Sequence, residues 1–481
     1  MINTIEQTLS WDSETTLPYG AVAHRTAQYR FLGDYKNSFW QKPEMDTLLS
    51  SSLKDESLEP HEKRNVELIN REFVRRQKLP ASLLSERTAQ AKQTHQIWRK
   101  AKEKNQFTMV IPDMKKLFNL NREYGTKLAE AFGMNDPFDA IVSTRDPGFS
   151  VSKISSLFED NRNFLIPLIK QVQKKQERSD YSILKTKVDR ATKEKLAAEV
   201  VKFYKYDSGS DTHARIGEVE HPLTIRCGPQ DARITVKFEA WEKVVFSAAH
   251  EVGHAIHSFN VKDEWKLEPI GQYGSPSLGE CNSRYTENKI GRSPEFWEYF
   301  FPKLNDITGG LAKDYTSDEF LQLLNRVVPG VSRMKADEVT YALHIIIRFE
   351  LEQELFSDKL TIEELPQAWN ERYDKYLGIT PQTDTEGLMQ DLHWYNVYWG
   401  YFQGYALGDI MGTQLHHTME KQNPEWKEAA RSGDYSPVYN FFVDNVYSVG
   451  ALYDPMQLVE KVTGEPLTNK YLQNYLKAKY T

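Results

Sequence analysis

VVFSAAHEVGHAIHSFN, residues 244–260, determines what kind of protein this sequence describes. Its apolar residues recur at three- and four-residue intervals, which predicts a helix. His250 and His254 are four residues apart, so they project about 40° apart from one helical face and can bind one metal ion. Glu251 adjoins the first histidine and can point at water, where a general base must stand. With 12 histidines in 481 residues, an accidental HExxH is expected in roughly a few per cent of such chains.

A catalytic zinc site needs a third protein ligand besides the two histidines. Metallopeptidases with a third histidine require Gly at 257 and His at 260, and His257 and Asn260 exclude that class. The alternative is a glutamate from a following helix. Glu280, in SLGECNSRYTEN, lies 26 residues after His254, and Glu287 lies about two turns further along the same face. Spacing alone leaves both glutamates as candidates.

Two residues near these candidates are expected to be structural. His257 follows His254 by three residues, but a catalytic zinc keeps one position for water, so a packed or solvated histidine is favoured. Cys281 is expected to be a small buried residue, because it points about 100° away from Glu280.

Most of the remaining sequence predicts helices, as in 82–108, 151–177 and 185–203. Residues from about 206 to 239 differ, because they are rich in Gly, Asp and Thr and end in the alternating ARITVKF. They predict a small strand element, which either binds an extended peptide at its edge or is a structural hairpin. No linker divides the chain, so we expect one domain over 1–481. That domain can consist of two helical lobes on either side of a groove.

Composition restricts the partners and the compartment. The formal net charge of −7 argues against general nucleic-acid binding and does not favour an anionic membrane surface. The two cysteines imply no disulfide framework. The N-terminus lacks the features of a signal peptide, and no apolar run is long enough to span a bilayer. We therefore expect a cytoplasmic protein without nucleic-acid or membrane partners.

Several further segments, in order along the chain, carry a family resemblance. They are LSWDSETTLPYGA (9–21), HPLT (221–224), DARIT (231–235), HEVGH (250–254), SRMKAD (332–337), DEVTYALHIIIRFELE (337–352), GLMQDLHW (387–394) and GYFQGYALG (400–408). Together they resemble the carboxypeptidase Taq family of metallocarboxypeptidases over nearly the whole chain. Leu223 stands where the family motif has Phe, and Ser332 stands where it has Ile. The departure that matters is at 279–283, where this chain has GECNS and the family has His-Glu-Ser-Gln-Ser. The resemblance implies that Glu280 is the third ligand, with altered contacts around it.

The resemblance also implies a mainly helical peptidase fold with a deep central groove, in a homodimer. It implies a metal-dependent carboxypeptidase that releases single residues from peptide C-termini with broad specificity. Zn²⁺, or alternatively Co²⁺, would be the ion, one per chain. Its substrates would be peptides with a free C-terminus.

Candidate residues for the remaining roles fall in the family motifs. His393, Tyr401 and Tyr405 are candidate donors to the oxyanion, with aromatic packing as the alternative for the two tyrosines. Arg333, and after it Arg348, are candidates to bind the substrate carboxylate, because a guanidinium pairs bidentately with a carboxylate. Either arginine can instead pair with an acid such as Asp337 or Glu350. Arg233 is expected to pair with a nearby acid, and Asp231 to serve a turn or a supporting contact.

Two rival functions remain open from the sequence. A helical metallo-endopeptidase acting on short peptides would also carry HExxH and a downstream glutamate. A non-catalytic peptide-binding homologue is the second rival, to which the altered GECNS segment gives some room.

Overall fold

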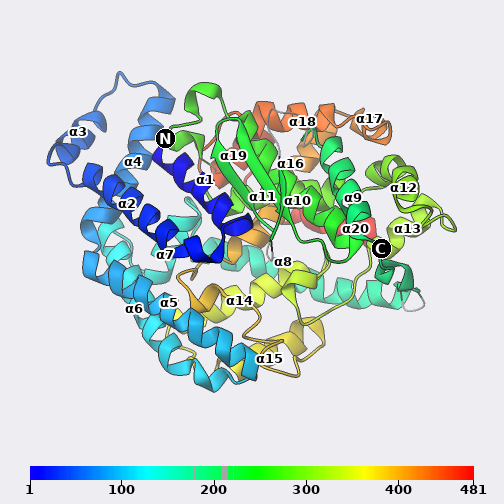
Figure 1. Ribbon diagram of the computed structural model, residues 1–481, viewed down its shortest axis with the longest axis horizontal. Coiled ribbons are helices and arrows are strands. Elements are labelled where there is room, and N and C mark those ends of the chain that lie inside the picture. The colour runs from blue at the N-terminus through cyan, green and yellow to red at the C-terminus, as the bar shows by residue number, and fades with distance from the viewer. Residues whose placement is uncertain (177–178, 207–214, 220–221, 273) are drawn as a thin grey trace.

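The computed structural model describes residues 1–481 except 177–178, 207–214, 220–221 and 273, and it consists mainly of helices (Figure 1). The helices before the sheet are α1 (Ile2–Thr15), α2 (Val22–Trp40), α3 (Glu44–Ser52), α4 (Pro60–Lys78), α5 (Ala81–Lys104), α6 (Ile111–Phe132), α7 (Pro137–Arg145), α8 (Val151–Gln176) and α9 (Arg190–Phe203). The strands are β1 (Ile216–Glu218), β2 (Thr224–Gly228) and β3 (Asp231–Val236).

The part of the chain after the sheet carries most of the family-like segments, some in its helices and some between them. Its helices are α10 (Trp241–Asn260), α11 (Pro276–Arg284), α12 (Pro294–Thr308), α13 (Ser317–Leu324), α14 (Tyr341–Phe356), α15 (Leu365–Leu377), α16 (Gln403–Gln422), α17 (Trp426–Arg431), α18 (Ser436–Phe442), α19 (Pro455–Thr463) and α20 (Lys470–Tyr480). Two π-helical turns, Tyr285–Ile290 and Val443–Tyr447, follow α11 and α18 directly. Across the described part of the chain, no helix combines the length and apolar character that a membrane-spanning segment requires. The mainly helical fold with a small β element before the HExxH helix is confirmed.

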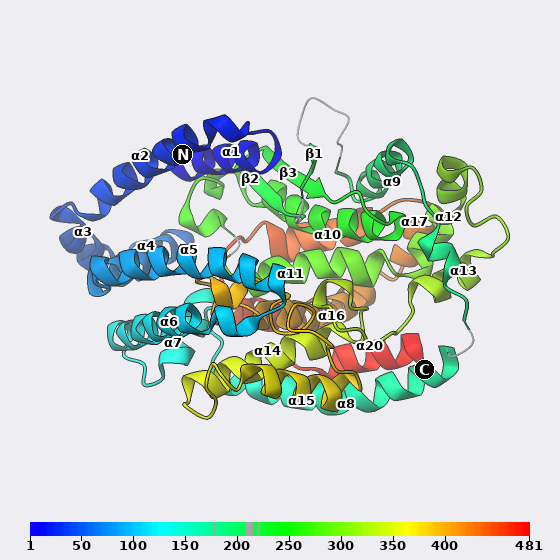
Figure 2. The same ribbon diagram turned by 60° about the horizontal axis from the view of Figure 1, so that its bottom comes forward.

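The three strands form one sheet in the order β1-β3-β2. β1 runs parallel to β3, and β2 runs antiparallel to it with Thr224 opposite Ile234. The sheet lies between α1 and α10 (Figure 2). Trp11 of α1 packs so closely on it that a Cβ on Gly217 would lie 2.8 Å from the Trp11 ring. His221 of the HPLT motif lies outside the described residues.

Helices α10, α11 and α16 pack together at the centre of the fold, where glycines permit close contact (Figure 1). A Cβ on Gly253 of α10 would lie 2.6 Å from the Asn282 carbonyl oxygen of α11. A Cβ on Gly408 of α16 would lie 2.8 Å from the Cys281 nitrogen. Such distances leave no room for a side chain, so these helices touch through their backbones. The contact fixes where α11 lies relative to the HExxH helix.

A buried charge cluster attaches the C-terminal helix to this centre. Glu338 accepts hydrogen bonds from Lys289 at 2.9 Å, from Lys479 at 2.7 Å and from the Tyr480 hydroxyl at 2.9 Å. Burial alone would raise the pKa of Glu338, but the two ammonium groups outweigh it and hold that pKa below its usual value. The cluster links α20 to the segments that precede α14 and α12.

Candidate metal centre

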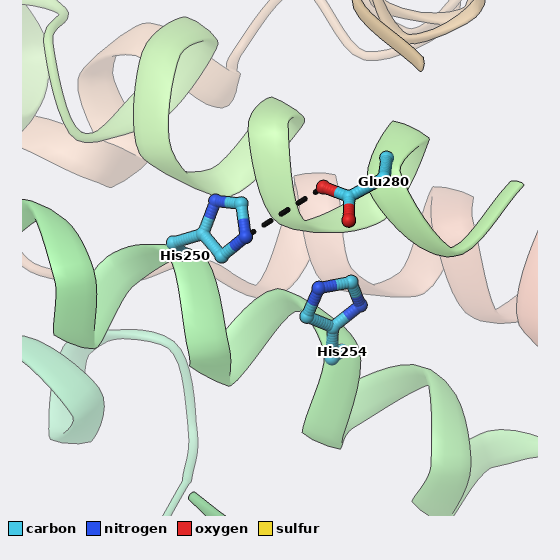
Figure 3. Close-up of side chains that lie close together, drawn as sticks. All are labelled: His250, His254 and Glu280. Carbon is cyan, nitrogen blue, oxygen red and sulfur yellow. Dashed lines mark ion pairs between the residues drawn. The ribbon is translucent and has the colours of Figure 1, made fainter. Parts of the chain in front are cut away.

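α10 and α11 bring the three predicted metal ligands together (Figure 3). His250 and His254 project from successive turns of α10, and Glu280 faces them from α11. Their ligand atoms lie within 4.8 Å of one another, and His250 Nε2 is 3.7 Å from Glu280 Oε2. α11 begins at the right place because Ser275 caps it, accepting a hydrogen bond from the Leu278 N–H.

Glu287, the competing ligand candidate, lies behind the first histidine instead. Its Oε2 is 3.0 Å from His250 Nδ1, so the other ring nitrogen faces Glu280. Glu287 also lies 3.9 Å from Arg284 and 3.8 Å from Arg292. Burial alone would raise the pKa of Glu287, but the contact with His250 and these two cations outweighs burial and lowers that pKa to about 2. A carboxylate in this position orients a ligating imidazole.

Glu251 is held beside the ligands by the edge strand β2. The Thr224 hydroxyl is 2.7 Å from Glu251 Oε2 and 2.9 Å from its carbonyl oxygen. Glu251 is only 4% exposed, and burial raises the pKa of its carboxyl to about 7. A carboxyl with that pKa can accept and return a proton near neutral pH.

The altered GECNS segment provides specific contacts around the ligands. Asn282 Nδ2 is 2.7 Å from His257 Nδ1, and the His257 ring stacks on Tyr447 at 5.1 Å. His257 is 1% exposed, which confirms the packed interpretation of this residue. Cys281 is fully buried, also as expected. A Cβ on Gly279 would lie 3.8 Å from His254 Cε1, so the missing side chain leaves a space beside the second ligand.

An aromatic group lies at the start of α16, the helix whose Gly408 packs against Glu280. The His393 ring lies 5.8 Å from Tyr401 and 6.5 Å from Tyr405, and Tyr401 lies 5.7 Å from Tyr405. Burial lowers the pKa of His393 to about 3, so this imidazole is neutral. Burial, and then the charge of Glu280, raise the pKa of Tyr401. Burial also raises the pKa of Tyr405, so both phenols stay protonated near neutral pH and can donate hydrogen bonds.

Asp391, which the sequence patterns did not single out, binds both candidate arginines. Its Oδ1 accepts hydrogen bonds from Arg333 Nε at 3.1 Å and Nη2 at 2.8 Å, and its Oδ2 accepts from Arg348 Nε at 2.8 Å. Arg333 also donates to the Tyr341 hydroxyl at 3.1 Å and lies 5.0 Å from the Tyr405 ring. Arg348 is 0% exposed, whereas Arg333 is 7% exposed and adjoins the aromatic group. Of the two arginines, Arg333 is thus the one that lies beside the aromatic group.

The DARIT residues have the structural roles that the sequence favoured. Arg233 donates to both carboxylate oxygens of Asp231, at 2.8 and 2.6 Å, and lies 5.5 Å from the Trp11 ring. This pair belongs to the interface between β3 and α1. The sequence patterns did not single out Thr224 or Asp391 as residues of the site. Thr224 nevertheless belongs to HPLT (221–224), and Asp391 belongs to GLMQDLHW (387–394).

The donor set fits a divalent transition metal. Two imidazole nitrogens and one carboxylate oxygen match the ligands of catalytic zinc, which binds them at about 2.0–2.2 Å. Ligand atoms 3.7 Å apart can share such an ion with little movement. Three protein ligands leave the coordination open for water or substrate.

Comparison with known proteins identifies the family. A family model described as carboxypeptidase Taq (M32) metallopeptidase matches residues 1–480. Carboxypeptidase 1 of Bacillus subtilis is 30% identical over 480 residues, covering 98% of this chain and 94% of that protein. The crystal structure of an M32 carboxypeptidase from Deinococcus radiodurans has a TM-score of 0.94 at 29% identity, covering 100% of this chain and 96% of that one. A Pyrococcus furiosus carboxypeptidase structure, described as Apo-Mg, has a TM-score of 0.95 at 27% identity, with the same coverage. The chain belongs to the carboxypeptidase Taq (M32) family and is a metal-dependent carboxypeptidase.

Proposed function

We propose that the chain releases single amino acids from free peptide C-termini with broad specificity, using a metal held by His250, His254 and Glu280. The observation that carries this proposal is the convergence of three ligand atoms within 4.8 Å beside a buried glutamate. A divalent ion bound there supplies a Lewis acid that activates water and polarises the scissile carbonyl. The N,N,O donor set supports Zn²⁺, with Co²⁺ as the alternative.

Glu251 is the proposed general base. It takes a proton from the attacking water and passes it to the leaving amine, and Thr224 keeps its carboxylate oriented. Tyr401, Tyr405 and His393 are the proposed donors to the developing oxyanion, because their side chains adjoin one another and α16, which carries Tyr405, packs against Glu280 through Gly408.

Arg333 is the proposed partner of the substrate C-terminal carboxylate. Its guanidinium is already oriented by Asp391, which Arg348 holds from the other side. A carboxylate that approaches Arg333 meets a cation whose geometry is fixed before binding.

Amidation of the substrate C-terminus tests the exopeptidase proposal. The metal-loaded enzyme should release the last residue of an unblocked peptide and leave the amidated peptide intact. Equal cleavage of both peptides would favour the endopeptidase alternative. Glu251→Gln should abolish turnover while retaining metal, and full activity in that variant would assign the base elsewhere. Metal binding without turnover in the unsubstituted protein would favour a peptide-binding homologue.

The homodimer also remains a proposal, and helix α2 offers a surface for it. All 19 residues of α2 are described and none is buried, while Phe31, Tyr35 and Phe39 form an exposed aromatic stripe. Such stripes mark interaction surfaces. Light scattering should give a dimer for the natural chain and a monomer for Phe31→Glu. A monomeric natural chain would exclude the dimer.

The central groove, the single domain with its two lobes and the cytoplasmic location stay predictions. The two cysteines are both free and buried, which agrees with a reducing compartment.

A further inference from the structure

Two neighbouring arginines, Arg87 of α5 and Arg145 at the end of α7, converge on one backbone carbonyl. Their Nη2 atoms donate to the Val397 oxygen at 3.2 and 2.7 Å, and Arg145 Nε donates to the Trp399 oxygen at 2.9 Å. Arg87 Nε donates to the Asn121 side chain at 2.8 Å. Among the described residues, no carboxylate lies within 4.0 Å of either guanidinium, unlike Arg333 and Arg348, which share Asp391.

The nearest acids among the described residues accept hydrogen bonds from other groups and form no ion pair with either guanidinium. Asp146 accepts from the Ser277 N–H at 2.9 Å, and Glu352 accepts from the Trp394 indole at 2.7 Å. Burial raises the pKa of both carboxyls, that of Glu352 to about 8. Burial also lowers the pKa of Arg145, and the charges of Glu352 and Asp146 offset only part of that effect. Two half-buried cations beside each other are unfavourable unless an anion joins them.

The arginine pair adjoins the catalytic residues and remains open to solvent. The Arg145 guanidinium lies 5.5 Å from the Tyr401 ring and 5.9 Å from the Tyr398 ring. Tyr398 is 39% exposed, so this side of the pair is reachable. Tyr401 in turn lies beside His393, and Asp146, next to Arg145 in the chain, accepts a hydrogen bond at 2.9 Å from Ser277 of α11, the helix that carries Glu280. A peptide bound at the metal centre would therefore pass near the pair.

We propose that Arg87 and Arg145 form a subsite for an acidic side chain of the bound peptide, so that the enzyme prefers substrates with Glu or Asp at one position. The subsite rests on the proposed function, because it orients a substrate that is cleaved at the metal centre. Each guanidinium has five N–H donors, and Nη1 of both makes no hydrogen bond to a described residue. These groups can bind a carboxylate while the contacts to the 397–399 backbone remain in place.

The test is a position scan with the metal-loaded full chain. N-acetylated pentapeptides with a free C-terminus carry Glu or Gln at one position at a time, and kcat/KM for release of the last residue is measured. At one position Glu should exceed Gln by about tenfold or more, which is the lower end of what a hydrogen bond to a charged group contributes. Arg87→Met and Arg145→Met should reduce that ratio to about one.

Matched variants separate binding from folding effects. Arg145→Lys keeps the charge and should retain part of the preference. Arg122→Met removes an arginine that pairs with Asp358 elsewhere and should leave the ratio unchanged. The Glu-to-Gln ratio of kcat/KM is measured within each variant. A general loss of activity lowers both values equally and therefore leaves the ratio unchanged.

Several results would overturn the subsite. They are the absence of a Glu preference in the unsubstituted enzyme, a preference that survives both Met substitutions, or equal losses on the Glu and Gln peptides. Release from every peptide without a Glu preference would refute the subsite alone. Failure to release the last residue from any peptide would refute the proposed function as well.

Discussion

Replacing Glu287 tests how the metal ligand His250 is held. Glu287→Ala removes the carboxylate 3.0 Å from His250 Nδ1 and leaves Arg284 and Arg292 facing the ring without it. Loss of such a partner typically weakens metal binding by about 10–100-fold, or about 1.4–2.7 kcal/mol. We expect a value near the upper limit, because the two remaining cations also repel a divalent ion. Glu287→Gln keeps an acceptor oxygen and should lose about tenfold.

The assay is competition for Zn²⁺ with a chromophoric chelator, which gives the dissociation constant without any measurement of turnover. Circular dichroism establishes that the variants are folded. Glu363→Gln is the matched control, because it neutralises a half-exposed glutamate that forms an ion pair with Lys115 at 2.7 Å. A folded Glu287→Ala protein with the natural affinity for zinc would refute the argument that Glu287 positions His250.

Three further predictions follow from contacts near the centre of the fold. Thr224→Val removes a hydrogen bond that lowers the pKa of Glu251, so that pKa should rise. Because the base acts when deprotonated, the acid limb of the pH profile of kcat/KM should move up by about one pH unit. An unchanged profile would contradict this prediction. Gly408→Ala should lower the free energy of unfolding by about 1–3 kcal/mol and weaken zinc binding, since its Cβ would lie 2.8 Å from backbone atoms of α11; urea unfolding and chelator competition measure the two effects. Glu338→Gln should lower the free energy of unfolding by about 3 kcal/mol at pH 7, because it leaves Lys289 and Lys479 buried without the carboxylate that pairs with both. The Glu338 pKa is depressed in the folded state, so this contribution is present above the usual glutamate pKa and is lost as pH falls below it; a difference in unfolding free energy that stays constant down to pH 3 would refute the assignment.

The sequence predicted those parts of the site that depend on helical periodicity. His250, His254 and Glu251 belong to one helix, so their spacing alone placed the histidines on one face. Glu280 and Glu287 also share a face, and periodicity could not distinguish the ligand from the residue that orients it. That distinction depends on where α11 crosses α10, which is a property of the packing.

The arginines illustrate the same limit. Arg333, Arg348 and Asp391 come from three separate segments, and the sequence offered local acids such as Asp337 and Glu350 as partners instead. Only the fold shows that one aspartate binds both. Arg87 and Arg145, which form no ion pair with a described residue, were not singled out from the sequence, because the lack of such a partner leaves no pattern along the chain.

The glycine contacts between α10, α11 and α16 bear on how the protein acquires its ion. Where helices meet through their backbones, no side chain can change rotamer to let one of them slide. Glu280 is thus presented to the two histidines in advance, and loading the ion orders little of the polypeptide. The conformational entropy of the ligand side chains is lost when the protein folds and not when the metal binds. Metal binding should therefore show a small change in heat capacity and no slow conformational phase.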